Sequence, residues 1–330
     1  MTFSTLVRDY GDIDAEVAAC RADAAVFDFS FMASGSVSGP AAMAAVQALT
    51  PRPLTSLQPG RIFYAVRVDE AGFARADLTI WQTGPESFDV FSGRGEDIAA
   101  LQGGRDLSAA TCVLSLQGPR SLAALSRLGD VRPLAALRYF EHATTRLAGI
   151  DCRVGRLGYT GERGFEIVTP ASGKARLWDA LAGEARPAGF AAADVLRIEA
   201  GFVLFTNEFA PSVTPAEAGL SRFCPSFGRP RVELVGFTAQ SRERPVLFSP
   251  GPGLAFPPPE GEIAITSAAW SAAARAVIGL GYVRTGTATE AFVDPADRFT
   301  AIRRVPIPFI DPDKRRVRGE WGVSAFPIRG

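Results

Sequence analysis

The sequence has a single histidine, His142, among its 330 residues. Imidazole is the general base of Ser-His and Cys-His nucleophilic sites and the commonest metal ligand in proteins. One histidine therefore excludes most of those catalytic arrangements and most histidine metal sites. We interpret His142 as a surface or strand-end residue. Any chemistry is then expected from carboxylates, tyrosines or a bound cofactor.

Cysteine is also scarce, with only four residues, at positions 20, 112, 152 and 224. They form no C-x-x-C pair and no cluster, so the spacing typical of a zinc site or a disulfide framework is missing. This pattern predicts buried, reduced thiols and no bound metal.

The chain has neither an excess of one charge nor a long apolar run. Lys+Arg and Asp+Glu number 35 each, so no global field attracts nucleic acid or a membrane surface. No run approaches the roughly 20 apolar residues that span a bilayer, and the N-terminus lacks the basic-then-apolar pattern of a signal peptide. We therefore predict a cytoplasmic protein without a nucleic-acid or membrane partner.

The length predicts more than one domain. Single hydrophobic cores stop growing at roughly 250 to 300 residues, so this chain favours two or three domains. A strand, a Gly-Pro pair and a helix follow one another twice, with the pairs at Gly39-Pro40 and Gly118-Pro119. The two copies indicate either a weak internal repeat or a chance similarity of two α/β units.

Hydrophobic periodicity assigns the remaining elements. The Pro- and Gly-rich stretch 245–261 predicts loops, because proline cannot continue a helix or a central strand. Short strands after it predict a C-terminal β-domain, either a small barrel or a sandwich. The expected helices are 12–27, 174–185 and 191–200, and the expected strands are 33–37, 62–68, 74–81, 87–91, 113–116, others between 151 and 168, then 262–266, 276–283 and 301–305.

One candidate carboxylate lies on the strand expected at 74–81. Strand alternation puts Ala74, Ala76, Leu78 and Ile80 on one face, and Arg75, Asp77, Thr79 and Trp81 on the other. Asp77 then shares a face with an aromatic ring, where a carboxylate can accept a proton or orient an amine. The alternative is an ordinary solvated strand face.

A second candidate, Glu166, follows a glycine-rich turn at 158–164. Glycine every third residue suits a tight turn with exposed backbone N–H groups, but the turn lacks the Gly-Lys-Ser/Thr ending of a phosphate-binding loop and a dinucleotide fingerprint. Alternation after the turn places Phe165 and Ile167 on one face and Glu166 on the opposite face. The pattern alone leaves Glu166 as an exposed carboxylate.

The helix expected at 191–200 carries Asp194 and Arg197 three residues apart. That spacing is typical of an intrahelical ion pair, which is a structural role.

Several stretches, in chain order, resemble the signatures of the glycine-cleavage T-protein, or aminomethyltransferase, family. The most specific is 158–167, with the sequence GYTGERGFEI. The others are 26–30 with 37–41, 116–119, 194–201 and 265–271. The matches run from about residue 26 to residue 271, so an agreement by chance is improbable.

The resemblance implies an α+β fold in the form of a three-lobed cloverleaf around a central channel. Two mixed α/β lobes would be interleaved along the chain, and the third would be a small C-terminal β-barrel. In this sequence the lobes correspond to 1–49 with 110–198, to 50–109 with 199–243, and to 244–330. Mixed α/β lobes followed by a C-terminal β-domain agree with the elements expected from the residues themselves.

The resemblance also implies a site and a cofactor. The channel would bind tetrahydrofolate, whose amine accepts a one-carbon unit carried on a leaving group. Asp77 matches the acidic residue that acts at the folate amine, although the family's usual acidic pair is Ala76-Asp77 here. Glu166 matches the carboxylate that hydrogen-bonds the pterin. Tyr64, Tyr139 and Tyr159 match tyrosines near the folate.

Some residues depart from the family's pattern. The arginine that usually precedes Asp194 and helps to hold an anionic part of the ligand is Ala193. An asparagine expected after the strand at 87–91 is Ser92, and a histidine of the N-terminal signature is Phe31. These departures weaken the case for the glycine-cleavage reaction itself.

Three functions therefore stay open at this point. The first is a tetrahydrofolate-dependent aminomethyl- or methyltransferase or a demethylase, with a small-molecule one-carbon donor or a lipoyl carrier protein as partner. The second is a non-catalytic folate-binding or accessory protein, although the Lys-Gly-Cys-Tyr motif of such relatives is absent around Cys224. The third is a relative that binds another ligand.

Overall fold

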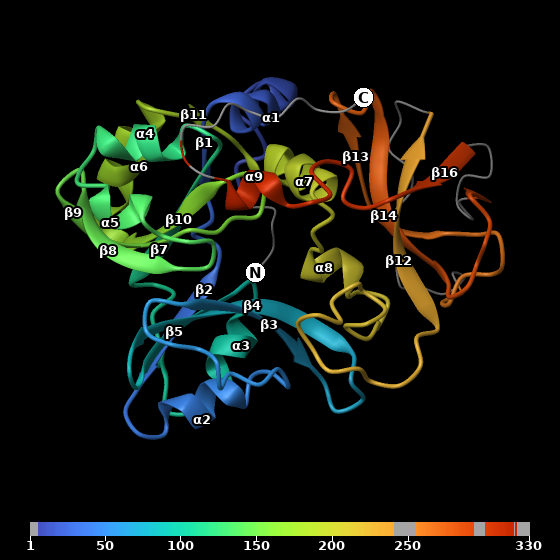
Figure 1. Ribbon diagram of the computed structural model, residues 1–330, viewed down its shortest axis with the longest axis horizontal. Coiled ribbons are helices and arrows are strands. Elements are labelled where there is room, and N and C mark those ends of the chain that lie inside the picture. The colour runs from blue at the N-terminus through green and yellow to red at the C-terminus, as the bar shows by residue number, and fades with distance from the viewer. Residues whose placement is uncertain (1–5, 241–254, 294–300, 320, 322–330) are drawn as a thin grey trace. The chain divides into compact units, whose positions relative to one another are not determined.

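The computed structural model describes residues 6–240, 255–293, 301–319 and 321 (Figure 1). They divide into two compact units. The first unit is drawn from Met1–Ala65, Asp77–Ala193 and Lys314–Phe326, and the second from Val66–Ala76 and Asp194–Asp313. The chain thus leaves the first unit and returns to it near its C-terminus. The predicted boundaries of three lobes stay a prediction.

A six-stranded sheet forms one part of the first unit, in the order β11-β1-β7-β10-β9-β8. All neighbours are antiparallel except β1 and β11, which run parallel. The strands are β1 (Ala25–Asp28), β7 (Thr111–Gln117), β8 (His142–Leu147), β9 (Ile150–Gly155), β10 (Gly164–Pro170) and β11 (Arg186–Pro187). The helices are α1 (Ile13–Ala22), α4 (Ser121–Ser126), α5 (Arg132–Ala135) and α6 (Lys174–Ala182), with a short 3-10 helix at Ala171–Gly173.

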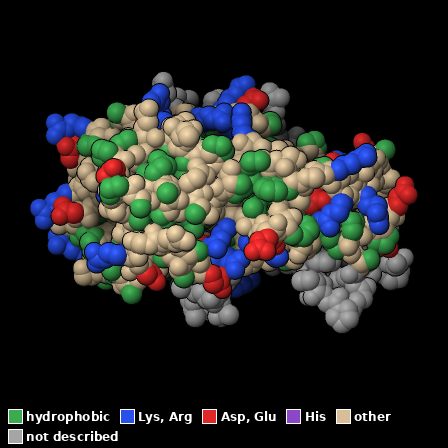
Figure 2. Space-filling model, turned by 90° about the horizontal axis from the view of Figure 1, so that it is seen from below, with side chains coloured by type: hydrophobic (Ala, Val, Ile, Leu, Met, Phe, Trp, Pro, Cys, Tyr) green, Lys and Arg blue, Asp and Glu red, His purple; other side chains and the backbone are tan. Residues whose placement is uncertain are grey.

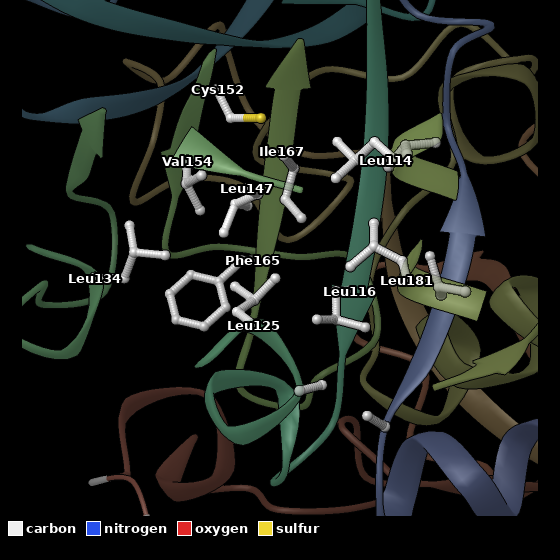
Figure 3. Close-up of a cluster of buried hydrophobic side chains, with 14 of the residues drawn as sticks. Leu114, Leu116, Leu125, Leu134, Leu147, Cys152, Val154, Phe165, Ile167 and Leu181 are labelled. Atoms are coloured by element: carbon white, nitrogen blue, oxygen red, sulfur yellow. The ribbon is translucent and has the colours of Figure 1, made fainter. Parts of the chain in front are cut away.

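Apolar side chains of this sheet and its helices make one core cluster, shown in Figure 3. Phe165 and Ile167 of β10 face it together with Leu114 and Leu116 of β7, and Leu125 of α4 packs beside Phe165. Because side chains alternate along a strand, Glu166 lies on the face of β10 opposite to this core. The alternation predicted after the glycine-rich turn is therefore confirmed.

A second sheet, most of whose residues belong to the first unit, has the order β3-β4-β5-β2-β6. Its strands are β2 (Ala33–Ser38), β3 (Ile62–Val68), β4 (Ala74–Gly84), β5 (Ser87–Ser92) and β6 (Arg105–Asp106), and α2 (Ala42–Gln47) and α3 (Gly95–Ala99) contribute to its core. In β4, Ala74, Ala76, Leu78 and Ile80 are buried while Arg75, Asp77 and Thr79 are not, as predicted. Trp81 departs from the pattern because it is buried against Phe91 and His142.

The second unit contains an antiparallel sheet in the order β13-β14-β12-β16-β15. Its strands are β12 (Val232–Ala239), β13 (Ala264–Ser271), β14 (Ala276–Arg284), β15 (Ala291–Val293) and β16 (Ala301–Val305). Within the described residues β13 and β15 do not pair, so this part of the chain forms an open sheet. The predicted C-terminal β-domain is present, and its closure into a barrel stays a prediction. The remaining helices are α7 (Phe190–Glu199), α8 (Phe205–Glu208) and α9 (Arg315–Arg318).

The start of α1 follows its local sequence signal, but its end does not. Asp12 caps α1 by accepting a hydrogen bond from the Ala15 N–H at 3.0 Å, as predicted. The helix stops at Ala22, however, and Ala25–Asp28 forms β1 in place of the expected last helical turn. The reason is tertiary, because the apolar run at 24–27 is buried and β1 pairs with β7 and β11.

The cysteines, the histidine and the Pro- and Gly-rich stretch can be compared with their predictions. The four cysteines are buried and free, as predicted. His142 opens β8, so it is at a strand end, but at 7% exposure it is not on the surface. Of the predicted loop 245–261, only 255–261 lies within the described residues, and it contains no helix or strand. In the part of the chain that the structure describes, no helix is long and apolar enough to cross a membrane.

Candidate functional site

Asp77 and Tyr64 are brought together by neighbouring strands of the second sheet of the first unit. Tyr64 is in β3 and Asp77 in β4, and the Tyr64 hydroxyl donates a hydrogen bond to the Asp77 carboxylate. Burial, followed by the charges of Asp77 and Tyr159, raises the pKa of Tyr64 well above its usual value. Tyr64 therefore stays a neutral donor at any ordinary pH.

Tyr159 joins this pair from the loop between β9 and β10. It lies close enough to Tyr64 for the two phenols to interact electrostatically. Tyr64, Asp77 and Tyr159 are all half-buried. The structure thus gathers three of the five predicted site residues into one polar cluster, which we call the Asp77 cluster.

Glu166 is a buried carboxylate in the middle of the six-stranded sheet. It is 8% exposed and lies opposite Ser115 of β7 and Gly155 of β9. No group among the described residues donates a hydrogen bond to its carboxylate. Burial raises the pKa of Glu166 to about 7. The interpretation of Glu166 as an exposed carboxylate is therefore wrong.

Tyr139 is the neighbour of Glu166. It is half-buried just before β8, and its ring meets the Phe140 ring edge-on, with centroids 4.6 Å apart. Burial and the nearby Glu166 charge raise the pKa of Tyr139, while the charge of Arg318 lowers it. Glu166 and Tyr139 thus form a second polar group in the same unit, which we call the Glu166 pair.

The glycine-rich turn connects the two groups, and its glycines have a packing reason. Gln117 is fully buried at the end of β7, and its side-chain amide donates to the Leu157 and Phe165 carbonyls and accepts from Thr160. A Cβ on Gly158 would lie 2.0 Å from Gln117 Oε1, and one on Gly164 would lie 2.5 Å from the Leu116 carbonyl oxygen. The glycines allow this close approach, so they need no bound phosphate to explain them.

Sequence reasoning missed the role of Gln117. Gln117 lies in 116–119, one of the stretches that resemble the family signatures. A glutamine at the end of an apolar strand, however, does not indicate its hydrogen-bond partners. The structure shows that the stretch at 116–119 and the stretch at 158–167 are two halves of one arrangement. This arrangement fixes the loop that carries Tyr159 and the strand that carries Glu166.

The second unit holds a buried charged cluster of its own. Arg197 pairs with Asp194 at 2.8 Å, which confirms the predicted intrahelical ion pair. Arg197 and Glu208 are both fully buried and pair at 2.9 Å, and Ser267 accepts from Arg197 and donates to Glu208. Each charge is paired and hydrogen-bonded, so the cluster has the features of a structural one.

Two of the departing residues have structural roles. Ser92 is buried and donates a hydrogen bond to Asp97 at 2.5 Å. Ala193 is buried within α7, so no charge occupies the position where the family usually has an arginine.

In the described residues, no group of three or more His, Cys, Asp or Glu side chains could hold a metal ion. Figure 2 shows Lys/Arg and Asp/Glu side chains interspersed on the face that it displays.

Comparison with known proteins identifies the family. Residues 6–226 match the family model described as the GCVT N-terminal domain. The probable aminomethyltransferase of Halobacterium salinarum is 35% identical over 316 residues, covering 86% of this chain and 85% of the relative. The aminomethyltransferase of Geobacillus kaustophilus is 33% identical over 342 residues, covering 91% of each. The chain belongs to the GCVT, or aminomethyltransferase, family.

A solved structure supports the fold of this aminomethyltransferase family member. The crystal structure of glycine cleavage system aminomethyltransferase T from Bartonella henselae superposes with a TM-score of 0.77 at 24% identity, covering 92% of this chain and 91% of that chain. The family resemblance and the mixed α/β fold predicted from the sequence are therefore confirmed. The roles of Asp77, Glu166 and the three tyrosines stay predictions.

Proposed function

We propose that this chain is a tetrahydrofolate-dependent one-carbon transferase, moving an aminomethyl or methyl group from a small donor to the folate amine. The observation that carries the proposal is the Glu166 carboxylate, which is buried, has no donor among the described residues and lies beside Tyr139. A buried acceptor without a donor costs free energy unless a ligand supplies one.

The residues present fit a reduced pterin. Its adjacent N–H groups are donors, and a carboxylate can accept two of them at once. Glu166 would hold that edge of the ring, and the aromatic side chain of Tyr139 would contact the ligand beside it. The same geometry suits no purely anionic ligand, because Glu166 would repel it.

Asp77 would carry the chemical step. Tetrahydrofolate, when bound, supplies the amine nitrogen that accepts the one-carbon unit. The Asp77 carboxylate would orient that N–H or take its proton, and the Tyr64 hydroxyl would hold the carboxylate in place for this task. The half-buried setting of Asp77 and Tyr159 would limit the water that competes for the transferred carbon.

The identity of the donor belongs to the proposal as well. The aminomethyltransferase names of the relatives favour an aminomethyl donor. The family resemblance adds a lipoyl carrier protein as a candidate carrier of that donor. A free small molecule is the alternative donor. We also carry over from the family a three-lobed cloverleaf with a central channel and a closed C-terminal barrel, as predictions.

A non-catalytic accessory role is the second candidate. The related accessory proteins carry a cysteine motif, and the cysteine in the corresponding region is Cys224. Burial raises the pKa of the Cys224 thiol to about 11. A thiol with such a pKa is a poor nucleophile at neutral pH, so the observation favours the transferase.

Calorimetric titration with tetrahydrofolate tests the proposal, using the wild type, Glu166→Ala and Asp77→Asn. We expect the wild type to bind, Glu166→Ala to bind at least tenfold more weakly, and Asp77→Asn to bind normally but to lose turnover. If titration of the wild type with tetrahydrofolate gives no binding heat, the folate proposal is wrong. Equal binding by Glu166→Ala would remove the role of Glu166, and unchanged turnover in Asp77→Asn would remove that of Asp77.

A further inference from the structure

Phe140 has a backbone conformation that phenylalanine rarely adopts. Its φ is +66°, in the left-handed region, where the Cβ of a bulky side chain comes too close to the neighbouring backbone. The turn at 138–141 is closed by a hydrogen bond from the Glu141 N–H to the Arg138 carbonyl at 3.0 Å, and Phe140 is its third residue. A positive φ at that position alone is typical of a type II turn, which favours glycine there. The residue that directly follows Tyr139 is therefore strained.

Hydrogen bonds on both sides hold Phe140 in this conformation. Its N–H donates to the Arg156 carbonyl at 2.9 Å, and its carbonyl accepts from the Ile62 N–H at 2.9 Å. Arg156 also holds both ends of the segment, because its side chain donates to the Leu137 carbonyl at 2.6 Å and its N–H donates to the Glu141 carbonyl at 2.8 Å. Strain of this kind persists only where the surrounding contacts over-determine the conformation, and it clusters at functional sites.

The Phe140 ring packs against the ring of Tyr139. The two rings meet edge to face, with centroids 4.6 Å apart and planes at 83°, which is a favourable geometry for an aromatic pair. The turn fixes the backbone of Tyr139, and the aromatic contact restricts its side chain. A glycine at position 140 would relieve the strain, but it would remove the ring against which Tyr139 packs.

The turn lies close to the strand that carries Glu166. Glu166 of β10 is opposite Gly155 of β9, and Gly155 is opposite His142 of β8, the first residue after the turn. Only β9 therefore separates Glu166 from the start of β8. Tyr139, three residues before His142, is held at the end of this row of paired residues.

We propose that Phe140 is a positioning residue of the ligand site, whose ring holds Tyr139 beside Glu166. This inference rests on the proposed function, in which Tyr139 contacts the pterin. Phe140 acts through Tyr139 and does not touch the ligand. The contact explains why a phenylalanine occupies a backbone position that favours glycine. Ligand affinity then depends on the ring at position 140, and stability depends on the backbone there.

Two substitutions separate the ring from the backbone. Phe140→Ala removes the ring and keeps the strain, because alanine still has a Cβ, whereas Phe140→Gly removes the ring and relieves the strain. Phe140→Tyr keeps the ring. Ala148→Gly is the matched control, because Ala148 also has a positive φ, +48°, and lies in the turn between β8 and β9. Each variant would be titrated with tetrahydrofolate by calorimetry and melted without ligand.

We expect Phe140→Ala and Phe140→Gly to weaken tetrahydrofolate binding equally, by about fivefold, because both lose the aromatic contact. The glycine variant should melt roughly 2–4 °C above the alanine variant, because only glycine relaxes the turn. Phe140→Tyr should bind within about twofold of the wild type, and Ala148→Gly should bind tetrahydrofolate as the wild type does.

A double variant tests whether Phe140 acts through Tyr139. Tyr139→Ala should weaken tetrahydrofolate binding by itself, and adding Phe140→Gly should then cause no further loss of affinity. A purely structural role of Phe140 would give the same loss in both backgrounds.

Three results would overturn the inference while the proposed function stands. They are wild-type affinity in Phe140→Gly, an equal loss of affinity in the Tyr139→Ala background, and equal melting temperatures of Phe140→Ala and Phe140→Gly. Unchanged binding in Tyr139→Ala would remove Tyr139 from the proposed site and would end the inference as well. If the wild type does not bind tetrahydrofolate, the proposed function fails and the inference fails with it.

Discussion

At the scale of single residues, Glu166 is the most informative side chain of the site. Its pKa is raised from 4.5 to about 7 by burial, so the folded protein prefers the protonated form more than the unfolded chain does. Ionisation of Glu166 therefore costs more free energy in the folded state than in the unfolded chain. The folded state is not penalised below the unfolded pKa, and its stability falls as pH rises from about 4.5 to about 7.

The first prediction concerns stability. A change of pKa from 4.5 to about 7 corresponds to about 3 kcal/mol, at roughly 1.4 kcal/mol per unit. In Glu166→Gln, which cannot ionise, the free energy of unfolding relative to the wild type should rise by about that amount between pH 4.5 and 8. Urea unfolding at several pH values would measure it. The exposed Glu70→Gln should show no such trend, and a flat difference for Glu166→Gln would contradict the assignment.

The second prediction concerns ligand affinity at the same residue. We assume that the N–H donors of the ligand need the ionised carboxylate. Below the pKa of Glu166, part of the binding free energy is then used to deprotonate it, so the affinity falls. With a pKa of about 7, tetrahydrofolate should bind about tenfold more weakly at pH 6 than at pH 8. Titrations across this range in Glu166→Gln give the ligand's own pH dependence. A wild-type profile parallel to that of Glu166→Gln would argue against this contact.

The third prediction separates positioning from binding. Tyr64→Phe removes the hydroxyl that donates to Asp77 but keeps the ring. One hydrogen bond to a charged group contributes roughly 1.5–3 kcal/mol, so turnover should fall about tenfold or more while the Kd for tetrahydrofolate changes less than twofold. Single-turnover kinetics and calorimetry would measure the two quantities. Tyr10→Phe, at an exposed tyrosine, is the control, and a loss confined to the Kd would assign Tyr64 to ligand binding only.

At the scale of elements, local patterns predicted the strands well and the contacts between them poorly. Alternation placed Asp77 correctly on the less buried face of β4 and Glu166 opposite the core. The same reasoning predicted that Glu166 is exposed, which is wrong, because burial of that face depends on other segments of the chain. The helix expected to reach 27 failed for the same reason, since pairing with β7 and β11 outweighs helical periodicity there.

The proposed site was accessible from the sequence only through the family resemblance. No spacing rule relates Tyr64 to Asp77 or Tyr139 to Glu166, because each pair meets through tertiary structure. Gln117 was visible as part of a short stretch, but three of its hydrogen-bond partners lie forty or more residues away.

The fourth prediction tests the close approach of the glycine-rich turn to Gln117. A Cβ on Gly158 would meet first the Gln117 side chain, whereas one on Gly164 would also meet the Leu116 backbone. Both Gly→Ala changes should lower the free energy of unfolding by about 1–3 kcal/mol. Adding Gln117→Ala should relieve the cost at 158 but not at 164.

Urea unfolding of the single and double variants gives the two coupling energies. Gly95→Ala is the matched control, because a Cβ there would meet nothing within 4 Å. Equal coupling at both positions would mean that the turn as a whole rearranges. The role of Gln117 as a specific contact of Gly158 would then be lost.

At the scale of the whole molecule, each unit contains a fully buried ionic cluster. In the first unit Glu162 joins Arg21 to Arg316 of α9, and in the second Glu208 pairs with Arg197. Removing one partner of a buried pair leaves an uncompensated charge, at a cost of about 3–5 kcal/mol. One substitution in each cluster therefore gives a matched pair of variants, one for each unit.

The last prediction uses hydrogen exchange measured by mass spectrometry on peptides from both units. Glu162→Gln should speed exchange in α9 and in the turn at 158–163, because α9 loses the carboxylate that binds Arg316. Exchange in β14 should stay near the wild-type rate. Glu208→Gln should do the opposite, affecting α8 and β13, whose Ser267 is hydrogen-bonded to Glu208. Equal acceleration of exchange in β14 by Glu162→Gln would contradict this prediction, because the Glu162 cluster would then stabilise both units and not the first unit alone.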